Sequence, residues 1–127
     1  DVATFTGSLA RFRDRVVPVE EQLAVNDRIV ALPFVRHTPG HTVYDVTSSA
    51  GHLLVWGDTV HVPSLQFTQP QVTWEFDGDQ PKARAARELL LDRLTGLGYF
   101  VAGAHLDSPG IGYVTRSGEG YVLHYVT

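Results

Sequence analysis

Three side chains that can bind a metal ion stand at comparable positions in the sequence. His41, Asp58 and His105 each follow the end of an apolar run, and each has a glycine one or two residues before it. Because side chains at one edge of a β-sheet can converge on a single point, we expect these three to lie together. Imidazole and carboxylate groups suit Zn²⁺, Mn²⁺ or Fe²⁺. The spacing therefore predicts a metal site.

A structural interpretation of the same residues stays open, because a Gly-His or Gly-Asp pair at the end of a strand is common. The Asp58 carboxylate could cap the loop that follows it, and the His41 ring could hydrogen-bond to a backbone carbonyl. Two further histidines, His52 and His124, lie within strand patterns and are expected to be structural or exposed. Spacing alone leaves both interpretations of the three candidates open.

The candidate ligands must be positioned by helices and strands, which the hydrophobic pattern predicts. Residues 4–24 are expected to be helical with an interruption at Pro18, and residues 81–94 form the clearest helix, with Asp79 as its N-cap. Apolar and β-branched runs predict strands over residues 28–36, 43–47, 52–56, 99–103, 111–116 and 121–126. Residues 59–79 are expected to be a long loop, and such loops in compact domains are usually functional.

This order of elements predicts an α/β fold with helices mainly on one face of a single sheet. Within residues 81–94, the apolar face is expected to hold Ala85, Leu89, Leu90 and Leu94, with Arg87 facing water. In the N-terminal region, residues 19–23 are expected to form a short second helical piece after Pro18. A sheet needs cover on both faces, and the two predicted helices can cover only one. A partner surface is therefore expected to be missing.

The composition indicates the class of protein but does not indicate the cellular compartment. The chain has 127 residues, 43% hydrophobic and 19% charged, as in an ordinary globular domain or part of one. Its net charge of −4 gives no electrostatic reason to expect nucleic acid or an anionic membrane as a partner. The absence of cysteine excludes disulfides and thiolate metal sites. Because residue 1 is Asp and not Met, we expect the chain to begin partway through a longer protein.

Longer motifs around the candidate ligands resemble those of a known superfamily. The segment 37–42, His-Thr-Pro-Gly-His-Thr, resembles the third conserved motif of the metallo-β-lactamase superfamily, 57–59 the fourth and 103–105 the fifth. The separations, 58 − 41 = 17 and 105 − 58 = 47, also fit. The longer stretches 57–67, 104–112 and 118–121 are similar to the branch that contains methyl-parathion hydrolase and quorum-quenching lactonase-like enzymes. The resemblance covers about residues 28–127.

This resemblance implies that residues 1–127 are the C-terminal half of an αββα sandwich with a mixed sheet. It implies that His41 is the third histidine of the first metal site, that Asp58 bridges both metals, and that His105 is the last histidine of the second site. The superfamily's remaining ligands come from a His-x-His-x-Asp-His motif in the N-terminal half, which is absent here. Three ligands from one half would leave a weak, open site, so we expect the chain alone to be inactive or nearly so.

The activity implied for the intact protein is metal-dependent hydrolysis of ester, lactone or phosphotriester bonds in a small-molecule substrate. Two ions, zinc or else manganese or iron, would hold a bridging water and lower its pKa, with Asp58 as the catalytic carboxylate. The loop 59–79 would line the substrate pocket. Candidate pocket residues are His61, Leu65, Phe67 and, opposite them, Leu106.

Other interpretations of the chain remain open at this point. Leu65 and Phe67 could be ordinary core residues, His61 could hydrogen-bond within its loop, and His37 could orient its loop instead of binding metal. The chain could also be a non-catalytic globular remnant or interaction module that keeps the motifs without metal. A flavodiiron-like or glyoxalase-like parent is a further, less favoured possibility. The expected partner is the missing N-terminal half or a second copy of the chain.

Overall fold

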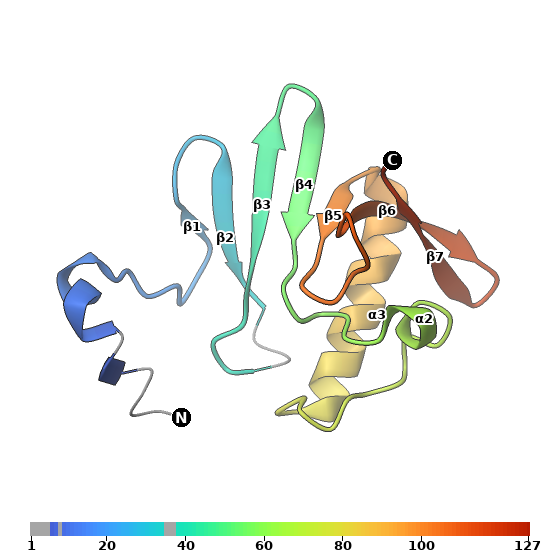
Figure 1. Ribbon diagram of the computed structural model, residues 1–127, viewed down its shortest axis with the longest axis horizontal. Coiled ribbons are helices and arrows are strands. Elements are labelled where there is room, and N and C mark those ends of the chain that lie inside the picture. Colours follow the sequence, from blue (N-terminus) through green and yellow to red (C-terminus); the bar gives the residue numbers. More distant parts are fainter. Residues whose placement is uncertain (1–5, 8, 35–37) are drawn as a thin grey trace.

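In the described part of the computed structural model, a single seven-stranded sheet with strands in sequence order forms the body of the molecule (Figure 1). The structure describes residues 6–7, 9–34 and 38–127. The strands are β1 (Leu23–Ala24), β2 (Ile29–Pro33), β3 (Thr42–Ser48), β4 (Gly51–Val55), β5 (Phe100–Ala102), β6 (Ile111–Ser117) and β7 (Gly120–Tyr125). All neighbouring pairs are antiparallel except β4 and β5, which are parallel. The predicted mixed sheet is therefore confirmed.

The parallel pair requires a crossover, and the connection from β4 to β5 supplies it. This connection holds the one-turn helix α2 (Pro63–Gln66) and the long helix α3 (Gln80–Leu97). The Asp79 side chain accepts a hydrogen bond from the backbone N–H of Lys82 at 3.1 Å, which is the predicted N-cap. Helix α3 ends at Gly98, whose φ of 64° is a left-handed C-cap conformation. No described helix is long and apolar enough to cross a membrane.

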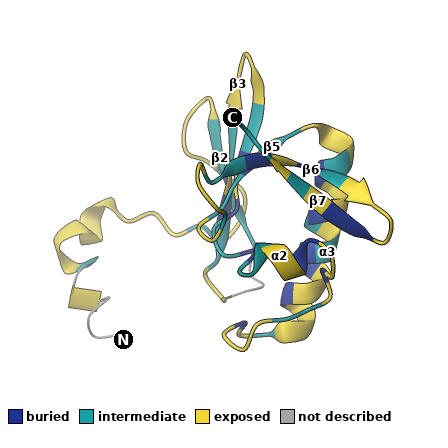
Figure 2. Ribbon diagram, turned by 45° about the vertical axis from the view of Figure 1, so that its right-hand side comes forward, coloured by how far each residue is buried: buried dark blue, intermediate teal, exposed yellow. Residues whose placement is uncertain are grey.

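The hydrophobic core lies between α3 and one face of the sheet (Figure 2). Its residues from the strands and the adjoining turn include Val43, Leu54, Trp56, Val101, Val114 and Tyr121, and its helix residues include Leu91 and Leu94. The predicted helix face is wrong in three places. Ala85 and Leu89 are exposed, whereas Arg87 is buried beside Ala83 and Ala86. The buried face is therefore displaced around the helix, and the loop before α3 supplies the polar partners that Arg87 needs.

The opposite face of the sheet carries large apolar side chains that no described helix covers. Tyr44 is paired with Val55, and Phe100 with Tyr113, so the members of each pair project from the same face. All four are exposed, as is Val122 on β7. The sequence-based expectation that one face would lack cover agrees with this arrangement of the described residues.

The N-terminal segment differs most from the predicted elements. Of the helix predicted over residues 4–24, the described part shows α-helical backbone only at residues 6–7 and 9. The short 3₁₀ helix η1 (Ala10–Arg15), which has no buried residue, follows directly. The predicted helical piece 19–23 is wrong, since the chain there is irregular and enters β1. Phe12, Val16 and Val17 are exposed, and this segment leads away from the sheet (Figure 2). Without a surface to pack against, an apolar helical stripe gains little stability.

The strand predicted over residues 28–36 is β2, which ends at Pro33. Residues 35–37, which include His37, lie outside the described residues.

Candidate metal centre

The turn after β4 and the turn after β5 meet because the two strands are parallel neighbours. The Trp56 N–H donates to the Ala102 carbonyl at 2.9 Å, and the Ala104 N–H donates to the Gly57 carbonyl at 3.3 Å. These two bonds continue the pairing beyond the strands. The residues that follow, Asp58 and His105, consequently come to the same edge of the sheet.

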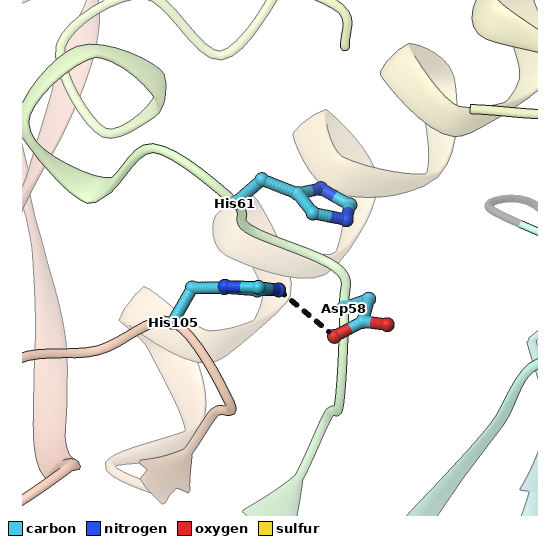
Figure 3. Close-up of side chains that lie close together, drawn as sticks. All are labelled: Asp58, His61 and His105. Carbon is cyan, nitrogen blue, oxygen red and sulfur yellow. Dashed lines mark ion pairs between the residues drawn. The ribbon is translucent and has the colours of Figure 1, made fainter. Parts of the chain in front are cut away.

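Asp58 and His105 are in direct contact at this edge (Figure 3). The His105 Nε2 lies 3.1 Å from the Asp58 Oδ1, and the two side chains are 43% and 41% exposed. His61 joins them from the loop after β4, with its ring centroid 4.9 Å from that of His105. One possible ligand atom from each of these three residues lies within 4.8 Å of the others. This is the possible metal-binding group of the described residues.

His41 lies beside this group and contacts the backbone on both sides of its ring. Its Nδ1 is 3.2 Å from the Phe34 carbonyl, and its Nε2 is 3.3 Å from the backbone nitrogen of Asp58. A carbonyl only accepts and a backbone N–H only donates, so these contacts require the tautomer protonated on Nδ1. His41 thus lies close to Asp58 but outside the group formed by Asp58, His61 and His105.

Glycine is required at position 57 for two independent reasons. Its φ is 55°, in the left-handed region, and an added Cβ would stand 2.9 Å from the His41 Nε2. Gly57→Ala is therefore expected to lower the free energy of unfolding by more than the about 1–2 kcal/mol of the backbone strain alone, as measured by urea denaturation. The matched control is Gly98→Ala, where φ is 64° and nothing lies within 4 Å of the added Cβ. An equal decrease in the free energy of unfolding in the two variants would show that the close approach of His41 does not contribute to the cost of Gly57→Ala.

The loop that carries Asp58 and His61 is held from one side by Arg87 of α3. The Arg87 Nε donates to the Thr59 carbonyl at 2.8 Å, and its Nη1 donates to the carbonyls of Pro70 and Val72 at 3.1 and 2.6 Å. Its Nη2 lies 3.5 Å from the Asp77 Oδ2, and both side chains are 1% exposed. Burial lowers the pKa of Arg87, and the neighbouring Asp77 carboxylate opposes that change.

The same loop is held from the other side by Gln66 of α2. The Gln66 Oε1 accepts hydrogen bonds from the backbone N–H groups of His61 and Val62, at 2.7 and 3.0 Å. Its Nε2 donates to the Val72 carbonyl at 3.0 Å. Sequence reasoning missed both Gln66 and Arg87, because their partners are backbone groups that no residue pattern reveals.

The other predicted pocket residues occupy different environments. Phe67 is buried and packs against Trp56, with ring centroids 6.2 Å apart. Leu65 is exposed, and Leu106 is half-buried against the core. The assignment of these residues to a substrate pocket stays a prediction.

Comparison with solved structures identifies the fold. The chain superposes on AidC, a dizinc quorum-quenching lactonase in complex with a product, with a TM-score of 0.88 and 21% identity over 99% of this chain and 43% of that chain. It superposes on AbOPH, a hydrolase in the beta-lactamase superfamily, with a TM-score of 0.86 and 23% identity over 99% and 44% of the two chains. The chain has the metallo-β-lactamase fold.

This metallo-β-lactamase-fold chain also matches a probable metal-dependent hydrolase from Staphylococcus aureus, with a TM-score of 0.73 and 15% identity over 91% and 42% of the two chains. No family model matches the sequence, and no curated protein matches it. The chain spans less than half the length of these solved structures, consistent with a C-terminal half of the fold. The resemblance inferred from the motifs is confirmed at the level of the fold.

The donor set of the candidate centre suits a divalent cation. Asp58, His61 and His105 offer one carboxylate and two imidazoles, which are ligand types that zinc and several other transition metals accept. The group stands at the edge of the sheet in a fold whose matched structures include a dizinc lactonase. A metal cofactor therefore fits the residues present.

Proposed function

We propose that this chain is the C-terminal part of a hydrolase that uses bound metal to cleave ester, lactone or phosphotriester bonds in small molecules. The contact of 3.1 Å between Asp58 and His105, with His41 directly beside Asp58, is the observation that carries the proposal. The proposed ligands are His41, Asp58 and His105. The proposed metal is zinc, with two ions in the complete protein and with manganese or iron as alternatives.

The chain's own residues would hold and orient the metal centre. Bound metal would polarise the scissile bond and supply hydroxide near neutral pH. The Asp58 carboxylate is open to solvent and already directed at His105, so it can bind a cation without a large rearrangement. The Phe34 carbonyl accepts from the His41 Nδ1, which favours the neutral tautomer with its lone pair on Nε2. That nitrogen would exchange its contact with the Asp58 backbone for a metal ion.

The complete active site is proposed to need a second layer on the open sheet face. Three ligands are too few for two zinc ions, which usually take about four ligands each. The face that holds the exposed side chains of Tyr44, Val55, Phe100 and Tyr113 offers an apolar surface for such a layer. We propose that the N-terminal half of the fold is this layer and brings the remaining ligands. A second copy of the chain is the alternative occupant.

Hydrolysis assays test this proposal directly. Protein that also carries the covering layer would be depleted with a chelator, reloaded with Zn²⁺ or Mn²⁺, and assayed with an aryl ester, an N-acyl lactone and a phosphotriester. Turnover of at least one substrate is expected only after reloading, and the 127-residue chain alone should show almost none. Metal-independent turnover, or none at all with every ion, would overturn the proposal.

A non-catalytic interaction module is the second candidate, and the exposed apolar face of the sheet favours it. Proteins that expose a large contiguous apolar patch usually bind a partner there. The same assays distinguish the two candidates, because a module would associate through this face but show no metal-dependent hydrolysis in any assembly.

A further inference from the structure

We propose that His61, held in place by Gln66, is a third metal ligand beside Asp58 and His105, so that this chain by itself binds one divalent ion. The inference rests on the proposed function, because it uses the same metal group. It departs from the sequence-based expectation of a weak site in the isolated chain, in which His61 was a pocket residue and not a ligand.

The distances place His61 within reach of one shared ion. Bonds of about 2.1 Å at tetrahedral angles separate ligand atoms by about 3.4 Å. The pair formed by Asp58 and His105 is at 3.1 Å, and all three ligand atoms lie within 4.8 Å of one another. Figure 3 shows the His61 ring above the contact between Asp58 and His105. Small side-chain rotations would therefore bring the three atoms around one ion.

His41 is less suited than His61 to this single-ion site. Both of its ring nitrogens contact the backbone, one at the Phe34 carbonyl and one at the Asp58 N–H. Binding an ion through the His41 Nε2 would require loss of the second contact, whereas the described ligand group forms without it. Three protein ligands with a fourth position for water or substrate is also the usual arrangement of a catalytic zinc ion.

Gln66 determines where the His61 backbone lies. One buried oxygen, the Oε1, accepts from the N–H groups of His61 and Val62, while the Nε2 anchors the amide to the Val72 carbonyl. The His61 ring also stacks against Trp74, with ring centroids 6.2 Å apart and an interplanar angle of 13°. Loss of the Gln66 amide would leave two backbone donors without their acceptor and release this segment. Gln66 is therefore a positioning residue that acts through His61.

A double-mutant cycle with Co²⁺ as the probe ion tests both parts of the proposal. Four proteins would be titrated with Co²⁺: the unaltered chain, His61→Ala, Gln66→Leu and the double variant. The visible absorption of the bound Co²⁺ would be followed in each. We expect one Co²⁺ per chain, at least about a 100-fold loss of affinity in His61→Ala, and a smaller loss of about 10–100-fold in Gln66→Leu. In the His61→Ala background, Gln66→Leu should have almost no further effect. Gln69→Leu, an exposed glutamine in the same loop, is the matched control and should bind normally.

Each outcome of the cycle supports or overturns a named part. Unchanged affinity in His61→Ala, together with loss in Asp58→Ala, would overturn the role of His61 and leave the proposed function standing. An equal effect of Gln66→Leu with and without His61 would overturn the positioning role. Absence of stoichiometric Co²⁺ binding in the unaltered chain would overturn the single-ion site, whatever the complete protein does. If Gln66→Leu fails to fold, Gln66→Glu serves in its place, because the glutamate retains an acceptor for both N–H groups. Its Co²⁺ affinity should stay within about threefold of that of the unaltered chain. A loss as large as that of removing a ligand would overturn the positioning role of Gln66.

Discussion

Asp58→Ala is expected to abolish metal-dependent hydrolysis in the complete protein and to weaken metal binding at least about 100-fold. Removing a residue that only supports a ligand costs about 10–100-fold in affinity, and loss of a ligand should cost more. Asp58 belongs both to the proposed two-metal site and to the group formed with His61 and His105. Calorimetric titration with Zn²⁺ and the hydrolysis assays would measure the two effects.

The structural cost of Asp58→Ala should be small, which separates loss of function from loss of fold. The side chain is 41% exposed, and surface substitutions usually change stability by less than about 0.5 kcal/mol. Asp92→Ala is a suitable control, because it removes an exposed aspartate that pairs with Arg116 on the helix side of the sheet. The control should bind metal and turn over normally. Unchanged turnover in Asp58→Ala would remove the proposed mechanism.

Arg87→Met is expected to lower the free energy of unfolding by about 3–5 kcal/mol, the cost of breaking a buried ion pair by removing one partner. The substitution leaves the Asp77 carboxylate buried without its cation and removes donors from the carbonyls of Thr59, Pro70 and Val72. Urea denaturation of the chain would measure the loss. Zn²⁺ affinity should fall as well, because the segment that joins Asp58 to His61 loses its anchor at Thr59.

The control for Arg87→Met lies one turn earlier on the same helix. Arg84 is exposed and pairs with Glu88 at 3.2 Å, so Arg84→Met should cost only about 0.3–0.5 kcal/mol. A loss below about 1 kcal/mol in Arg87→Met would mean that the buried bonds to the loop carry little net free energy. A large loss of stability with unchanged metal affinity would show that Arg87 supports the core and not the site.

Local sequence patterns were sufficient to predict several elements and part of the candidate site. The Asp79 N-cap and the glycine at position 98 delimit α3 by interactions within a few residues of each helix end. Apolar and β-branched runs likewise predicted strands over residues 111–116 and 121–126, which match β6 and β7. The repeated placement of Asp58 and His105 after apolar runs correctly indicated two turns at one sheet edge, because consecutive strands with a crossover commonly pair in parallel.

Residues whose environment depends on distant segments were assigned differently by the tertiary structure. Helical periodicity assigned Arg87 to water, since arginine is almost never fully buried unless it is paired, and its partners lie outside the helix. The carbonyls of the loop and the carboxylate of Asp77 decided otherwise. The N-terminal segment shows the converse, because its apolar spacing suits a helix but no described surface is present to bury Phe12 or Val17.

The sequence by itself determined the succession of strands along the chain and the start of the main helix, because these follow from interactions between near neighbours; the helix continues to Leu97, three residues beyond the predicted end at residue 94. It also predicted the proximity of Asp58 to His105, which follows from the ends of paired strands. Only the tertiary structure decided that His61 joins those two residues and that His41 contacts the backbone beside them. The physical reason is that a metal group is assembled by contacts between separate turns. The Gln66 and Arg87 hydrogen bonds that orient those turns go to backbone atoms, which are alike in every sequence.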